Sequence, residues 1–220
     1  MKNQTKNILA LFVAFLLIFG AYTASNYESD PVDNGESSEE EVEDNLTEFI
    51  SWEDGASMGD PDAPVRMVNF SSYYCPFCVT FKEDVFPLLE DKYIDEGDLF
   101  YLYRDLGEPG DSTFQASYCA DEEGSFWDYQ KALYKEDPTP GFSTQELISL
   151  AGDLGLNQEE FEYCLEQNRY DNMITMANLE ADSLGITGTP YILIENTEVV
   201  GLRDFEDYKS IIEEKLNENN

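Results

Sequence analysis

The sequence contains no histidine, and this absence removes several kinds of catalytic site. A Ser-His or Cys-His nucleophile pair, an HExxH zinc site and a CxxCH haem attachment site each need an imidazole. Basic residues are also scarce, because only 12 Lys and Arg accompany 47 Asp and Glu, for a formal net charge of -35. A surface with this charge repels a phosphate backbone, so the composition argues against nucleic-acid binding.

The acidic excess is typical of proteins from salt-loving organisms. A carboxylate-rich surface stays hydrated in concentrated salt, where the Debye length falls to about 3 Å at 1 M. We therefore expect a high-salt habitat, with an ordinary acidic secreted protein as the alternative. The chain can still build a core, because 42% of its residues are hydrophobic and 14% are aromatic.

The N-terminus has the layout of an export signal. Two lysines precede an apolar run over residues 8–24, the order of the n-region and h-region of a signal peptide. Tyr22 is bulky for the position where cleavage prefers a small residue, so residues 1–24 form either a signal peptide or a retained membrane anchor. We expect the protein outside the cytoplasm, either secreted or held on the outer face of the cell membrane by residues about 8–24.

The segment that follows is strongly acidic. Residues 25–48 carry ten acidic side chains and no basic one. Such a segment repels itself and has little apolar surface to bury. The sequence therefore predicts a disordered linker over residues 25–55 and a folded domain over residues 56–217.

The residue pattern of this domain predicts an α/β fold. Continuous or alternating apolar residues predict strands over 63–71, 99–103, 191–194 and 198–201. Helical spacing and cap residues predict helices over 79–93 (kinked at Pro87), 114–121, 125–134, 143–154, 157–184 and 204–216. The order is βαβ, then helices, then ββα, which indicates a helical insert over about 110–184.

Cys75 and Cys78 lie three residues apart, after a predicted strand and at the start of a predicted helix. Both side chains then share one face, and Cys75 lies at the positive end of the helix dipole. Free backbone N–H groups stabilise a thiolate there, so Cys75 is the expected nucleophile and Cys78 resolves the mixed disulfide. Half of a zinc site is the alternative, but zinc needs a second close pair, and the remaining cysteines are 45 residues apart. The sequence predicts neither a metal site nor a cofactor.

A second motif precedes the predicted hairpin. The segment Tyr74-Cys75-Pro76-Phe77-Cys78, the helical insert and the segment Gly185-Ile186-Thr187-Gly188-Thr189-Pro190 together resemble the DsbA-like thiol:disulfide oxidoreductases. The resemblance covers about residues 57–217. It implies a thioredoxin fold, with a central mixed sheet flanked by helices and an inserted helical subdomain. It also implies a cis peptide bond at Thr189-Pro190 beside the active-site disulfide, where the backbone binds an extended substrate chain.

The two residues inside the motif are Pro76 and Phe77, and Phe77 departs from the best-studied members, which carry His within the CxxC sequence. A phenyl ring neither donates a hydrogen bond nor brings positive charge to a thiolate. We therefore expect Cys75 to be less acidic than in those members, and the negative charge of the protein to raise its pKa further.

The sequences around Cys119 and Cys164 also resemble helices of the family's insert. We hypothesise a structural disulfide between these two residues. An oxidising compartment favours such a bond, and closing a loop of this length contributes roughly 4 kcal/mol in the chain-entropy model. Two buried free thiols are the alternative.

The resemblance implies an enzyme that passes a Cys75-Cys78 disulfide to folding, exported polypeptides. A membrane re-oxidase, DsbB-like or VKOR-like, would then restore the disulfide. A disulfide reductase or isomerase would use the same residues at a different redox potential. A non-catalytic module that binds polypeptides along the Pro190 edge is the third interpretation.

Overall fold

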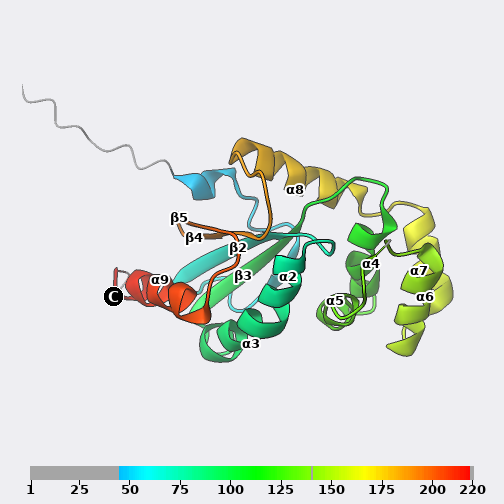
Figure 1. Cartoon of the computed structure of the whole chain (residues 1–220), viewed down its shortest axis with the longest axis horizontal. Coiled ribbons are helices and arrows are strands. Elements are labelled where there is room, and N and C mark those ends of the chain that lie inside the picture. The colour runs from blue at the N-terminus through cyan, green and yellow to red at the C-terminus, as the bar shows by residue number, and fades with distance from the viewer. Residues whose placement is uncertain (1–44, 140, 219–220) are drawn as a thin grey trace, which may run out of the picture. The chain divides into compact units, whose positions relative to one another are not determined.

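The computed structural model describes residues 45–139 and 141–218, so the predicted export signal and the linker up to residue 44 lie outside the described residues. A five-stranded mixed sheet forms the centre of the domain (Figure 1). Its strands are β1 (Ala56–Met58), β2 (Val65–Ser71), β3 (Leu99–Asp105), β4 (Tyr191–Ile194) and β5 (Thr197–Val200). The spatial order is β1-β3-β2-β4-β5, with β2 and β3 parallel and the other pairs antiparallel.

The sheet divides two apolar layers, and its strands alternate between them. Along β2, Val65 and Met67 face one layer, whereas Val68 and Phe70 face the other. The same alternation runs along β3 and β4, as expected for strands buried on both faces. This double burial explains why the sequence reads as nearly continuous apolar runs in these strands.

One face of the sheet is covered by the helix that follows β2 and by α9 (Phe205–Glu218) (Figure 1). The first helix runs without a break through α2 (Pro76–Thr80), the π-helical turn η2 (Phe81–Val85), α3 (Phe86–Leu89) and a second π-helical turn, η3 (Glu90–Ile94). The sequence predicted a kink at Pro87, and π-helical turns flank the short segment that contains it. Proline has no N–H to donate, which favours such a change of hydrogen-bond register.

A helical subdomain lies beside the sheet and is inserted after β3 (Figure 1). It consists of α4 (Ser112–Asp121), α5 (Phe126–Leu133), α6 (Thr144–Asp153) and α7 (Gln158–Glu166). A full capping box, Ser143 with Glu146, begins α6. These helices agree with the predicted pattern.

The predicted helix over 157–184 is instead two helices. It breaks after α7, where Asn168 takes a positive φ of 47°, and resumes as α8 (Asp171–Ser183). Asparagine tolerates this left-handed conformation better than most residues. Helix α8 packs back on β3, so it covers the second face of the sheet rather than belonging to the insert alone.

The domain begins earlier than the sequence predicted, because residues 45–55 are packed against it. They include a short 3-10 helix, η1 (Leu46–Phe49), and the buried side chain of Ile50. Assigning all of residues 25–55 to a disordered linker was therefore wrong for this part. The prediction followed the acidic composition and gave too little weight to Ile50 and Trp52, whose side chains pack in one of the two apolar layers beside the sheet.

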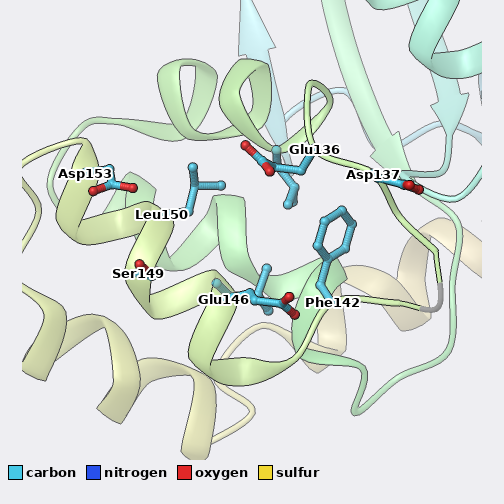
Figure 2. Close-up of a pocket in the computed structure, with 9 residues that line it drawn as sticks. Glu136, Asp137, Phe142, Glu146, Ser149, Leu150 and Asp153 are labelled. Atoms are coloured by element: carbon cyan, nitrogen blue, oxygen red, sulfur yellow. The ribbon is translucent and has the colours of Figure 1, made fainter.

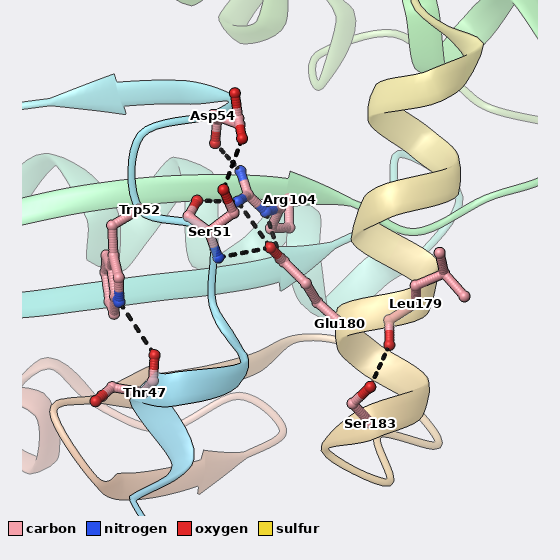
Figure 3. Close-up of polar contacts among 8 residues, drawn as sticks. All are labelled: Thr47, Ser51, Trp52, Asp54, Arg104, Leu179, Glu180 and Ser183. Carbon is pink, nitrogen blue, oxygen red and sulfur yellow. Dashed lines mark hydrogen bonds and ion pairs between the residues drawn. The ribbon is translucent and has the colours of Figure 1, made fainter.

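A buried ion pair holds this N-terminal segment in place (Figure 3). Arg104 Nε donates to Glu180 Oε2 at 2.6 Å, and both side chains are almost fully buried. The same guanidinium donates to the carbonyl oxygens of Ser51 and Asp54, and Glu180 accepts a hydrogen bond from Ser51 N. One buried charge pair thus joins β3, α8 and the start of the domain. Within the described residues, no helix is long and apolar enough to cross a membrane.

Candidate active site

Cys75 lies between the end of the central strand β2 and the start of helix α2. Its backbone N–H donates to Ser72 O in the connecting turn, and Cys75 is the N-cap residue of α2. Pro76 occupies the first helical turn, where the N–H that proline lacks would have no helical partner. The Cys78 N–H donates to Cys75 O at 3.0 Å, so one helical turn connects the two cysteines.

The two thiols have different environments. Both are free in this structure, Cys75 half-buried and Cys78 fully buried. Burial opposes ionisation of Cys75, but hydrogen bonds from Thr189, Cys78 and the backbone N–H groups of Cys78 and Phe77 outweigh it and lower the pKa of Cys75. Burial raises the pKa of Cys78 to about 11, although Ser71 and Thr189 hydrogen-bond to it.

Phe77 contributes to the site through exposed apolar surface. Its side chain is 59% exposed between the two cysteines, and only its backbone assists the thiolate. The pKa of Cys75 is therefore lowered without a histidine. That the Cys75 thiol is less acidic than in family members with His inside the CxxC motif stays a prediction.

The second predicted motif lies against the first. The Thr189-Pro190 peptide bond is cis, and the Cys75 thiol donates to the Thr189 carbonyl oxygen at 3.2 Å. Pro190 is buried, whereas Gly188 just before this dipeptide is exposed. The structure thus brings together residues more than 110 positions apart in the sequence.

The other two cysteines form a disulfide away from this site. Cys119 in α4 and Cys164 in α7 are bonded, with an S–S distance of 2.03 Å and a Cα–Cα distance of 5.8 Å. Both are buried within the helical subdomain. The bond connects two helices of the insert.

Tyr74, just before the first cysteine, fastens the active-site turn to the helical subdomain. Its hydroxyl donates to Asp111 Oδ2 at 3.1 Å and lies 2.9 Å from Thr113 Oγ1. Its ring packs edge-on against Phe114 and stacks on Phe142. The sequence shows Tyr74 only as part of a motif, because the partners of its side chain lie in a distant loop and helices.

Phe142 also lines the pocket shown in Figure 2, which has a volume of about 210 Å³. Apolar side chains, among them Leu133 and Leu150, alternate there with the carboxylates of Glu136 and Asp153. Neither active-site cysteine lines it. In the described part of the chain, no group of three or more Cys, Asp or Glu side chains is arranged to hold a metal ion.

A chain of buried hydroxyl groups begins beneath Cys78. Interaction with Ser71 opposes the rise in the pKa of Cys78, and the Ser71 hydroxyl lies 2.9 Å from the Tyr134 hydroxyl. Tyr134 in turn lies 2.9 Å from the Tyr103 hydroxyl, which donates to Asp105 Oδ1 at 2.6 Å. None of these four residues was predicted from the sequence to lie near the active site. The one available signal was an aspartate at the end of a strand that begins with five apolar or aromatic residues.

Comparisons with known proteins show which family this chain resembles. The thioredoxin family model matches residues 51–214. Disulfide bond formation protein D of Bacillus subtilis is 28% identical over 171 residues, which cover 72% of this chain and 76% of the relative. The probable disulfide bond formation protein D of Bacillus anthracis is 25% identical over 231 residues, covering 98% of this chain and 99% of the relative.

Solved structures show the same fold. Oxidised BdbD from Bacillus subtilis superposes with a TM-score of 0.64 at 25% identity, covering 73% of this chain and 92% of that one. Alpha-DsbA1 from Wolbachia pipientis gives a TM-score of 0.70 at 22% identity, covering 80% and 97%. The chain therefore belongs to the thioredoxin family and, within it, to the DsbA-like thiol:disulfide oxidoreductases.

Proposed function

We propose that this enzyme is an extracytoplasmic oxidase that transfers a Cys75-Cys78 disulfide to folding, exported polypeptides. The contrast between the two thiols carries the proposal: the pKa of Cys75 is lowered and that of Cys78 is raised. Hydrogen bonds that stabilise the Cys75 thiolate stabilise the reduced protein. A stabilised reduced form makes the corresponding disulfide more oxidising, which favours disulfide donation over reduction.

In the first step, a substrate thiolate attacks Cys75 Sγ, the more accessible sulfur. The Cys75-Cys78 bond breaks, its electron pair stays on Cys78, and a mixed disulfide joins Cys75 to the substrate. A second substrate thiolate then attacks the substrate sulfur, which releases an oxidised substrate and the Cys75 thiolate. We assign substrate binding to the Thr189-Pro190 edge, because this backbone lies against the reacting sulfur.

The names of the relatives support disulfide formation as the activity. The two Bacillus proteins are named disulfide bond formation proteins. Each turnover leaves Cys75 and Cys78 reduced, so a second protein must remove two electrons. We propose that this second protein is a membrane re-oxidase, DsbB-like or VKOR-like. We also propose that residues 8–24 either anchor the enzyme to the outer face of the membrane or are cleaved, which releases it.

The decisive experiment is the reduction potential of the Cys75-Cys78 pair, equilibrated with glutathione buffers at molar salt. An oxidase should have a potential well above that of thioredoxin, roughly -270 mV. The Cys119→Ala/Cys164→Ala variant is the matched control, because it retains only the active-site pair. A potential at or below the thioredoxin value would contradict the oxidase and leave a reductase with the same residues.

A second assay tests catalysis directly. The oxidised enzyme is mixed with a reduced, unfolded protein that needs disulfides for activity, and recovered activity is followed. We expect Cys75→Ser to abolish the reaction, because no sulfur remains to accept the substrate thiolate. If Cys75→Ser kept full activity, the cysteines would be structural and the protein a polypeptide-binding module.

A further inference from the structure

Aromatic side chains connect the pocket in Figure 2 to the active-site turn. The Phe142 ring forms part of the pocket wall and stacks on Tyr74, with the two ring centroids 6.2 Å apart. Tyr74 precedes Cys75 and is 38% exposed, and Phe77 on the other side of that cysteine is 59% exposed. Exposed aromatic surface therefore leads from the reacting sulfur to the pocket.

The pocket has an apolar floor and an acidic rim. Leu133 and Leu147 are buried beneath it, and Leu150 and Phe142 are half-buried at its side. Figure 2 shows that Phe142 and Leu150 extend toward the space between them, with the Glu136 carboxylate at its border. The carboxylates that line the pocket belong to Glu136, Asp137, Glu146 and Asp153.

Two of these four carboxylates already have partners. Glu146 accepts hydrogen bonds from Ser143 in the capping box of α6, and Asp137 accepts one from the loop that follows it. Glu136 and Asp153 have no ion-pair partner within the described residues. Among the described side chains that line the pocket, none is basic. The rim therefore presents negative charge that a cationic group from outside can neutralise.

We propose that this pocket receives a lysine or arginine side chain of the substrate polypeptide, a few residues from the cysteine that attacks Cys75. A long basic side chain buries its methylene stem on apolar surface and keeps its charged end at a polar edge. The pocket volume of about 210 Å³ suits one such side chain, since sites for drug-sized ligands begin at roughly 300 Å³. The proposal rests on the exchange proposed above and names a substrate class for it.

The test must separate a contact in the pocket from attraction to the whole acidic surface. The net charge of -35 attracts any cationic chain. At about 1 M salt the Debye length is about 3 Å, which suppresses this long-range attraction much more than a contact between partly buried groups. A preference for a basic side chain that persists in molar salt therefore reports a contact.

The experiment uses the full oxidised chain and pairs of synthetic peptides in about 1 M KCl. Each peptide has one cysteine, and the members of a pair differ only in a lysine or a norleucine, placed in turn at successive positions on either side of the cysteine. The mixed disulfide with Cys75 is trapped with acid and measured by mass spectrometry. An ion pair at a partly exposed site changes affinity by up to about 5-fold. We expect lysine at the best position to lower the half-saturating peptide concentration by roughly this factor, with little change in the maximal rate.

Two kinds of variant disturb the pocket in different ways. Glu136→Gln/Asp153→Asn removes the two available charges and should abolish the preference for lysine. Ser149→Phe adds bulk at an exposed position of the pocket lining without changing charge, and it should also abolish the preference. The matched control is Glu162→Gln/Glu166→Gln, which removes the same charge from exposed positions of α7 outside the pocket and should keep the preference.

The outcomes distinguish this pocket from the function on which it rests. If the unsubstituted protein reacts equally with both peptides of every pair, the pocket proposal is wrong and the oxidoreductase stands. The same conclusion follows if the control loses the preference as fully as the charge variant, or if the preference survives Ser149→Phe. If no peptide forms a mixed disulfide although dithiothreitol reduces the Cys75-Cys78 bond, the proposed function itself is wrong. A folding defect in either pocket variant leaves the other to decide.

Discussion

The Cys119-Cys164 disulfide should contribute a large part of the stability of the helical subdomain. It closes a loop of 45 residues between α4 and α7. In the chain-entropy model, a loop of this length restricts the unfolded chain enough to stabilise the fold by about 4 kcal/mol. For a slope of roughly 2 kcal/mol per M urea, reducing the bond should lower the unfolding midpoint by about 2 M.

The assay compares one protein in two redox states. A Cys75→Ser/Cys78→Ser background leaves Cys119 and Cys164 as the only pair that a phosphine reductant can open. Urea unfolding of this protein, with and without reductant, then measures the bond without changing a side chain. The control is the same background with both remaining cysteines replaced by alanine, for which the reductant should make no difference.

A specific result would refute this reasoning. If the oxidised and reduced proteins unfold at the same urea concentration, the loop is already restricted in the unfolded chain or the bond strains the fold. If the alanine control shifts equally with reductant, the effect belongs to the solvent and not to the bond.

Three other predictions follow from groups in the sheet and at the active site. Glu180→Gln should destabilise the fold by about 3 kcal/mol in urea unfolding, since it leaves the Arg104 guanidinium buried without its partner charge; Glu213→Gln, on the exposed Lys92 pair, is the control and should change little. The raised pKa of Asp105 means that the folded protein holds this proton more tightly than the unfolded chain, so its stabilising effect is lost as pH rises from the ordinary aspartate pKa through the raised one. The difference in unfolding free energy between the unsubstituted protein and Asp105→Asn should therefore shift in favour of the variant with rising pH, and a pH-independent difference would contradict it. Molar salt should lower the pKa of Cys75 and speed turnover by screening the net charge of -35, a shift that thiolate titration at low and high salt would detect or disprove.

The sequence predicted the main elements of the fold because their periodicity is strong. The long apolar strands β2, β3 and β4 and the helices of the insert lie close to their expected positions, except that the single helix expected over 157–184 is two helices. Strand β1 was missed, since it has three residues and no alternation that exceeds chance. It exists because β3 offers an open edge to which it pairs.

The candidate site was predictable only where the chain itself carries the pattern. The CxxC motif and the Gly-Thr-Pro turn are local sequences, so Cys75, Cys78 and Thr189 were found. The hydroxyl path below them could not be found in the same way. It joins side chains from two strands and the end of α5, and no spacing in the sequence marks serine and tyrosine in a core as partners.

The two tryptophans of the chain are placed where separate parts of the domain meet. Trp52 packs near Phe100 with the Arg66 guanidinium 4.3 Å from its ring, at the junction of the N-terminal segment and the sheet. Trp127 lies between α5 and the core, with Phe86 and Tyr101 beside it.

Each junction therefore contains its own fluorophore. A Trp127→Phe variant would report only detachment of the N-terminal segment, and a Trp52→Phe variant only separation of the helical subdomain from the sheet. Emission from the two variants, followed during unfolding, would show whether the domain opens at one junction before the other.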